Sequence, residues 1–224
     1  MNEYKGKIKL WHCYLGEYPI SQRFGDHFYN KEGKCVYVEM GMDGHNGIDF
    51  TLPIGTKLIA VSDGKVTEVI SENKGYGNHM RLHCFQGDIK FEVLYAHCSK
   101  FLVKQGESVF KGQPIAGSGS TGFSSGPHLH FGLRILGEQG NVINHNNGYF
   151  GSINPLELFD LSESNTPVNL DKAKEKKLNI EIIKWAKEMG IILDEEIIQL
   201  ELNNNITIEQ FLTLLKRYHN SIKK

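Results

Sequence analysis

The chain lacks the marks of several common protein classes. No apolar run approaches the ~18 residues of a membrane-spanning helix, so we expect no membrane span. Residues 1–15 carry charges and hold no apolar stretch of signal-peptide length, so no secretory signal is predicted. The formal net charge is −1 and no block of Lys or Arg stands out, which argues against nucleic acid as a partner.

Cysteine pairs at metal-binding spacing are also missing. The four cysteines, Cys13, Cys35, Cys84 and Cys98, show no Cys-x-x-Cys pattern, so a structural zinc knuckle is not expected. We predict reduced, partly buried thiols. A His-Glu-x-x-His motif is absent as well, which excludes a zinc peptidase whose ligands lie on a helix.

Glycine and short alternating runs are abundant. The chain contains 24 glycines, and from residue 7 to residue 159 the pattern is typical of short strands separated by turns. Strands are predicted at 57–61 and 65–70, and a hairpin is predicted to join 78–85 to 89–96 through Gly87. Strands this close together, without helical crossovers, predict a mainly β, Gly-rich antiparallel domain.

The character of the sequence changes after Leu161. We predict a β domain over 1–161, a polar linker over 162–170 and a small helical C-terminal domain over 171–224. Apolar residues recur at helical spacing between 179 and 190, and Thr207 with Gln210 fits a capping box at the start of a second helix.

The segment from Gly44 to Phe50 holds the first pair of candidate metal ligands. Its glycines disfavour a helix, and in an extended segment residues two and four apart share one face. His45 and Asp49 would then flank Gly47, whose missing side chain leaves space for an ion. A turn-capping Asp beside a surface His would give the same spacing, so this pair alone is a weak signal.

A second pair of histidines lies in a segment that begins with turn residues and continues as a strand. His128 and His130 must share one face, while Leu129 and Phe131 point into the core. Two adjacent imidazoles are poor core residues because each needs a hydrogen-bond partner when buried. His97 lies at the end of a predicted strand. The remaining histidines have no partner at ligand spacing: His12, His27, His79, His83, His145 and His219.

Together these motifs resemble the lysostaphin and LytM type of zinc metallopeptidase, a family of peptidoglycan endopeptidases. That family has a His-x-x-x-Asp motif, here His45 to Asp49, and a later His-x-His motif, here His128 to His130. The resemblance runs from about residue 18 to residue 155 in the same order and includes the segments 95–97, 106–116, 117–122 and 126–128.

The resemblance implies an open groove in the β domain and a zinc ion as cofactor. It assigns His45, Asp49 and His130 as zinc ligands and His97 and His128 as catalytic residues. Three protein ligands would leave one tetrahedral position open for water, whose pKa zinc lowers to about 7. The two catalytic histidines could deprotonate the water or stabilise the oxyanion, and the sequence does not divide these tasks between them.

The resemblance also predicts bacterial peptidoglycan as substrate, action on the cell wall outside the cytoplasm, and a monomer. Without a signal peptide, the chain would suit a phage or prophage endolysin, or a protein whose leader was removed. We expect specificity to depend on groove loops such as 71–78 and 138–149, and the bond that is cut stays open. The alternative function is a non-catalytic wall-binding or virion-associated module of the same fold.

Overall fold

A computed structural model describes residues 3–14 and 18–159. These residues belong to one compact unit of the chain, Met1–Pro167. The predicted linker at 162–170 and the predicted helical domain at 171–224 lie outside the described residues, so both stay predictions.

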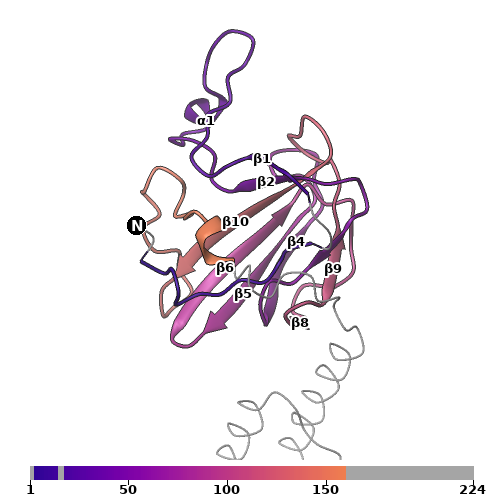
Figure 1. The fold of residues 1–224 in the computed structure, drawn as a ribbon, viewed down its shortest axis with the longest axis vertical. Helices are drawn as coiled ribbons and strands as arrows, with labels where there is room; N and C mark the ends of the chain where they lie inside the picture. Colours follow the sequence, from indigo (N-terminus) through magenta and orange to yellow (C-terminus); the bar gives the residue numbers. More distant parts are fainter. Residues whose placement is uncertain (1–2, 15–17, 160–224) are drawn as a thin grey trace, which may run out of the picture. The chain divides into compact units, whose positions relative to one another are not determined.

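A seven-stranded antiparallel sheet forms the centre of the described unit (Figure 1). Its strand order is β1-β2-β10-β6-β5-β4-β8, so the last long strand enters between β2 and β6. The strands span Ile20–Gln22 (β1), Ile48–Thr51 (β2), Gly64–Ile70 (β4), His79–Gln86 (β5), Ile89–Ala96 (β6), Ser108–Val109 (β8) and His128–Leu136 (β10).

A smaller sheet holds the three remaining strands, in the order β3-β9-β7. They span Lys57–Ile59 (β3), Lys100–Phe101 (β7) and Pro114–Gly117 (β9). The two helical elements of the described residues are short: α1 at Val36–Glu39 and a 3₁₀ turn at Leu156–Leu158. The prediction of a mainly β, antiparallel fold is therefore confirmed.

The predicted hairpin is present as β5 and β6, which pair from Met80↔Tyr95 to Gln86↔Ile89 across a two-residue turn. The predicted strands at 57–61 and 65–70 also form, but they do not pair with each other. β3 pairs with β9 in the smaller sheet, whereas β4 pairs with β5 and β8 in the larger one. Alternation of apolar residues predicted each strand without specifying its partner.

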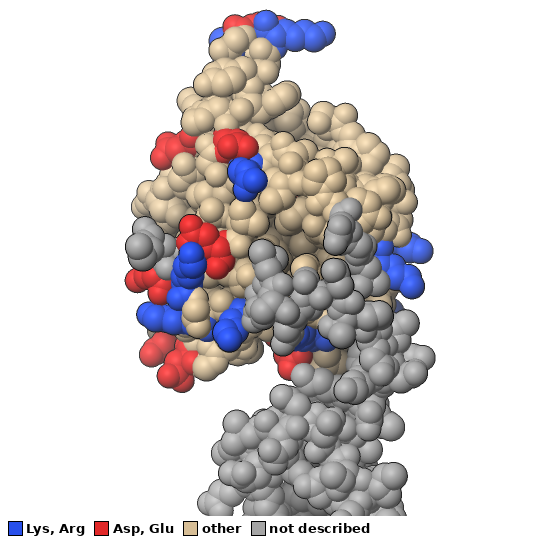
Figure 2. All heavy atoms as spheres, in the orientation of Figure 1, with Lys and Arg blue, Asp and Glu red and all other residues tan. Residues whose placement is uncertain are grey.

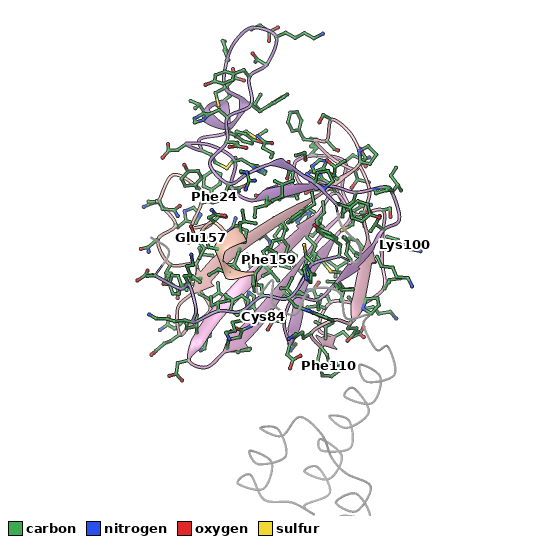
Figure 3. The ribbon with its side chains drawn as sticks, in the orientation of Figure 1. Phe24, Cys84, Lys100, Phe110, Glu157 and Phe159 are labelled. Atoms are coloured by element: carbon green, nitrogen blue, oxygen red, sulfur yellow. The ribbon has the colours of Figure 1, made fainter. Side chains whose placement is uncertain are left out.

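The core forms on one face of the large sheet because apolar residues alternate along its strands. On β10, Leu129, Phe131, Leu133 and Ile135 are buried and belong to one continuous hydrophobic cluster. Phe159, labelled in Figure 3, packs its ring against Phe131 at 5.5 Å between centroids. The opposite face of β10 is left to carry polar side chains.

A segment of residues 26–44, which we call the arm, stands out from the sheet at the end where β1 and β2 lie (Figure 1). Its base closes where Gly25 N donates to His45 O at 2.8 Å and His45 N donates to Asp26 O at 2.9 Å. A Cβ on Gly44 would lie 2.6 Å from Gly25 O, so this close approach requires glycine. Figure 2 shows Lys, Arg, Asp and Glu side chains of both signs at the tip of the arm.

The cysteines are free, as predicted, with three buried and Cys35 partly exposed. Cys98 follows His97 and points the opposite way, into the core, where its thiol lies 3.6 Å from Tyr95 O. None of the helices within residues 3–14 and 18–159 is long and apolar enough to span a membrane.

Candidate metal centre and groove

Strand register brings the central candidate residues together from distant parts of the chain. On neighbouring strands β2 and β10, Asp49 is paired with His130 and Thr51 with His128. His130 is also paired with Ala96 on β6, so His97 follows directly at the end of that strand. Opposed residues of an antiparallel pair have Cβ atoms about 4.5–5.5 Å apart, which allows their side chains to converge.

His45, Asp49 and His130 form a tight cluster of buried ligand atoms. His130 Nδ1 lies 3.0 Å from Asp49 Oδ1 and 2.9 Å from His45 Nε2, and His45 Nε2 lies 3.2 Å from Asp49 Oδ1. His45 lies in an irregular segment before β2 rather than in the extended strand that its spacing predicted. It reaches the cluster from the base of the arm.

Gly47 is essential to this cluster for a reason that differs from the predicted one. A Cβ at this position would lie 2.6 Å from His130 Cε1 and 2.6 Å from Phe131 O. The space that glycine leaves is therefore filled by the imidazole of His130. No side chain can occupy position 47 unless that ring moves.

Backbone carbonyl groups fix the tautomers of the surrounding histidines. Nδ1 of His45 lies 3.1 Å from Arg23 O, Nδ1 of His97 lies 2.8 Å from Thr121 O, and Nδ1 of His128 lies 2.8 Å from Gly126 O. A carbonyl only accepts, so each Nδ1 carries the proton and each Nε2 keeps a lone pair. His130 has the reverse orientation, with Nδ1 in the cluster.

The charges of the cluster support a carboxylate beside neutral imidazoles. Burial would raise the pKa of Asp49, but the hydrogen bond from His130 and the nearby His45 imidazole outweigh it and hold the pKa well below its usual range. Burial lowers the pKa of His130. Burial, followed by the nearby His130 and His128, lowers the pKa of His97 to about 4. These imidazoles are therefore available as lone-pair donors at neutral pH.

The donor set fits a zinc ion. Two imidazole nitrogens and one carboxylate oxygen are common zinc ligands, and the three atoms all lie within 4.8 Å of one another. Ligands at about 2.0–2.2 Å in a tetrahedron are about 3.3–3.6 Å apart, close to the separations seen here. The bond from His45 Nδ1 to Arg23 O is a typical support for a metal ligand, whereas His130 Nε2 is buried without a hydrogen-bond partner among the described residues.

His97 and His128 lie beside the cluster, with 4.5 Å between their ring centroids. His128 Nε2 is 3.7 Å from Asp49 Oδ2, too long for a direct hydrogen bond. His97 has a φ of +58°, a left-handed conformation that bulky residues seldom adopt. The β6 strand ends here, and the unusual backbone turns the imidazole towards the cluster instead of the solvent.

A groove of about 530 Å³ opens over these five histidine and aspartate side chains. The arm contributes one side of its lining, with Phe28, Tyr37 and Met40. The expected loop 71–78 contributes Gly75 and Tyr76, whereas no residue of the expected loop 138–149 lines the groove. The loop 138–149 contacts the base of the arm instead, where Asp43 N donates to Gly148 O at 2.8 Å and Tyr149 packs on Phe24, so its effect on specificity stays a prediction.

Two polar groups beside the cluster were missed by the reasoning from the sequence. Asn46 Nδ2 donates to the hydroxyl of Tyr76 at 2.7 Å, and the Tyr76 ring lies 5.3 Å from that of His130. Because Tyr76 accepts this bond, its own O–H remains free to donate into the groove. Asn46 lies between His45 and Gly47, so its position inside the first motif was the available signal.

Comparison with known proteins gives a consistent picture. Residues 43–152 match the model of Peptidase family M23. The glycyl-glycine endopeptidase ALE-1 of Staphylococcus capitis is 46% identical over 94 residues, which are 41% of this chain and 25% of that protein. The peptidoglycan DD-endopeptidase ShyA of Vibrio cholerae is 39% identical over 115 residues, or 51% of this chain and 26% of that protein.

Among solved structures, the catalytic domain of the antimicrobial peptidase lysostaphin from Staphylococcus simulans is 32% identical. The match covers 62% of this chain and 90% of that domain, with a TM-score of 0.47. The chain spans about a quarter of the length of the curated relatives ALE-1 and ShyA. The matched segment contains all five clustered residues, and the chain belongs to peptidase family M23 through its residues 43–152.

Proposed function

We propose that this protein is a zinc-dependent endopeptidase that hydrolyses peptide bonds of bacterial peptidoglycan. One observation carries the proposal. Three buried ligand atoms converge at a groove, and two further histidines stand beside them without belonging to the set. Relatives named as glycyl-glycine and peptidoglycan endopeptidases support the substrate class and action on the cell wall.

In this proposal His45 Nε2, Asp49 Oδ1 and His130 Nδ1 hold the zinc ion. Zinc, when bound, would act as a Lewis acid on the scissile carbonyl and make the attacking water more acidic. Asp49 would offset part of the metal's charge, and the contact with Arg23 O holds the His45 imidazole in place.

His97 and His128 supply proton transfer at the groove. Each has its Nδ1 proton committed to a backbone carbonyl, so each offers Nε2 as the acceptor for a proton of the water. The free O–H of Tyr76 can donate to the oxygen that becomes negative as the tetrahedral intermediate forms. A monomer suffices for this chemistry, because all these groups come from one chain.

A non-catalytic wall-binding module is the competing function. Such a module would need the groove but not three metal ligands with two additional, oriented histidines. All five side chains line the groove, and Nδ1 of both His97 and His128 is bonded to a backbone carbonyl. This completeness favours the enzyme.

Metal analysis and wall digestion test the proposal together. We expect about one zinc per chain, and loss of wall lysis in a strong chelator that zinc restores. Mass spectrometry of fragments from walls with different cross-links would identify the bond that is cut. Full activity in a metal-free preparation, or binding to walls without any new peptide termini, would contradict the proposal.

A further inference from the structure

The polar face of β10 continues beyond the zinc cluster to an arginine. His130 and Arg134 share this face because side chains alternate along a strand, and both line the same groove. A strand rises about 3.3 Å per residue, so Arg134 lies about 13 Å along β10 from the metal ligand. The groove therefore joins the reaction centre to a guanidinium group.

Arg134 is poorly paired for an arginine that is largely buried. Its side chain is only 18% exposed, yet its one ion pair among the described residues is with Glu92 Oε1 at 3.6 Å. That oxygen already accepts a bond of 2.7 Å from Arg81 Nη1. The other oxygen of Glu92, Oε2, lies 3.5 Å from His83 Nε2, so Glu92 is shared with two other side chains. A guanidinium has five N–H donors, and most of those on Arg134 have no acceptor within residues 3–14 and 18–159.

We propose that Arg134 forms a carboxylate-binding subsite of the groove, which recognises a free carboxylate of the peptide substrate about four residues from the metal ligands. This inference rests on the proposed function. A carboxylate can accept two parallel bonds from a guanidinium, which gives both affinity and orientation. An extended peptide of about four residues spans the 13 Å between the subsite and the cluster.

The subsite gives the groove a preference among wall peptides. Stem peptides that keep free carboxylates satisfy Arg134, whereas peptides with carboxamides in their place leave a partly buried guanidinium without a matching anion. The penalty for a missing charged partner corresponds to about a 10- to 100-fold lower kcat/KM.

The test compares two cross-linked stem-peptide dimers, one with its carboxylates free and one with each converted to a carboxamide. The zinc-loaded wild-type protein should cleave the carboxylate dimer about 10- to 100-fold more efficiently. In Arg134→Gln the ratio of the two kcat/KM values should fall to about one, and Arg134→Lys should keep an intermediate ratio. Lys100→Gln, which removes a positive charge from an exposed residue of β7 (Figure 3), should keep the wild-type ratio.

Binding of both dimers, measured by calorimetry, separates this inference from the proposed function. A carboxylate preference in binding that Arg134→Gln removes would support the subsite even if neither dimer were cut. Equal affinity of the wild type for both dimers would overturn it, as would a preference that survives in Arg134→Gln. Should Arg134→Gln fail to fold, the ratio in Arg134→Lys decides, since an unchanged ratio would also overturn the subsite.

Discussion

Individual histidines of the groove differ in whether a ring nitrogen reaches Asp49, and we expect this difference to divide them by role. His45 and His130 present nitrogens to Asp49, whereas His97 and His128 have their Nε2 atoms outside the ligand cluster. A variant of one residue should therefore lose either the metal or the turnover. Variants of His128 and His130, which lie two residues apart on β10, are the most informative to compare.

His130→Ala removes a ligand, so zinc affinity and activity should fall together. His128→Ala and His97→Ala should retain zinc and lose about 10²-fold or more in kcat, because their work is on the proton and the charge of the transition state. Bound zinc and kcat measured side by side for the three variants check this division. Loss of metal in His128→Ala with retention in His130→Ala would mean that the two roles are exchanged.

Tyr76→Phe removes only the hydroxyl that Asn46 orients. We expect kcat to fall by about 10²-fold with little change in KM or zinc content, since one donor to the oxyanion is lost. Phe85→Leu, at an exposed aromatic residue of β5 outside the groove lining, is the control and should behave as wild type. Wild-type kcat in Tyr76→Phe would remove this residue from the mechanism.

At this scale the sequence predicted a great deal. The grouping of His45, Asp49 and His130 was predicted from the resemblance to the lysostaphin type, since the spacing within each motif does not say which histidine joins Asp49. Tyr76 could not, because its contact with Asn46 joins residues 30 apart through a loop that has no periodicity. Arg134 was also missed, since its weak pairing depends on Arg81 and Glu92 on two other strands.

At the scale of loops and strands, two glycines allow a close contact between the loops that contain residues 77 and 122, and this contact positions His97. Gly77 and Gly122 both have positive φ, and a Cβ on either would overlap the backbone of the other loop. This contact places Thr121, whose carbonyl accepts the Nδ1 proton of His97. Backbone contact between the loops is therefore coupled to the orientation of His97, a residue that we propose to be catalytic.

Gly122→Ala should lower the free energy of unfolding by about 2 kcal/mol or more, through left-handed strain of about 1–2 kcal/mol plus overlap with Gly77. It should also reduce kcat, because a shift of the loop would displace the Thr121 carbonyl that binds His97 Nδ1. Gly55→Ala is matched, with a φ of +87° but no atom within 4 Å of the added Cβ, so it isolates the strain alone. Chemical denaturation and kcat for both variants check this, and equal effects would show that the loop contact does not matter.

Strands were easier to predict than their arrangement. Alternating residues predicted β5, β6 and β10 and turn residues located their ends, although β6 and β10 are buried on both faces over most of their length. The arm was not predicted, since its closure depends on the approach of Gly25 to Gly44 and not on any repeat in the sequence. Pairing of β3 with β9 likewise joins segments more than 50 residues apart.

The whole β domain should fold without the residues after Leu161. The described core is complete at Phe159, and Leu10 N donates to Leu158 O at 2.7 Å. A protein ending at Leu161 should be soluble and zinc-loaded and should still cleave soluble peptide. If the remainder targets the wall, activity on intact walls should fall.

A protein ending at Asn154 is the matched control. It loses Leu158, which is 2% exposed, and should be less stable by about 2–5 kcal/mol. Thermal unfolding of both truncations measures the difference. Insoluble protein on ending at Leu161 would place part of the C-terminal region in the main core, and unchanged activity on walls would argue against a targeting role.

The base of the arm has a consequence for how the protein responds to metal. His45 contributes a ligand atom to the cluster, while its backbone N–H and C=O close the arm and its Nδ1 binds Arg23 O. Any ion held by His45 therefore makes opening of the arm costlier, by about 2.7 kcal/mol at a free metal concentration of 100 Kd if opening abolishes binding. Amide hydrogen exchange at Gly25 and His45 should accordingly slow up to about 100-fold as zinc is added. Exchange at the base of the arm would then measure metal binding in the absence of substrate.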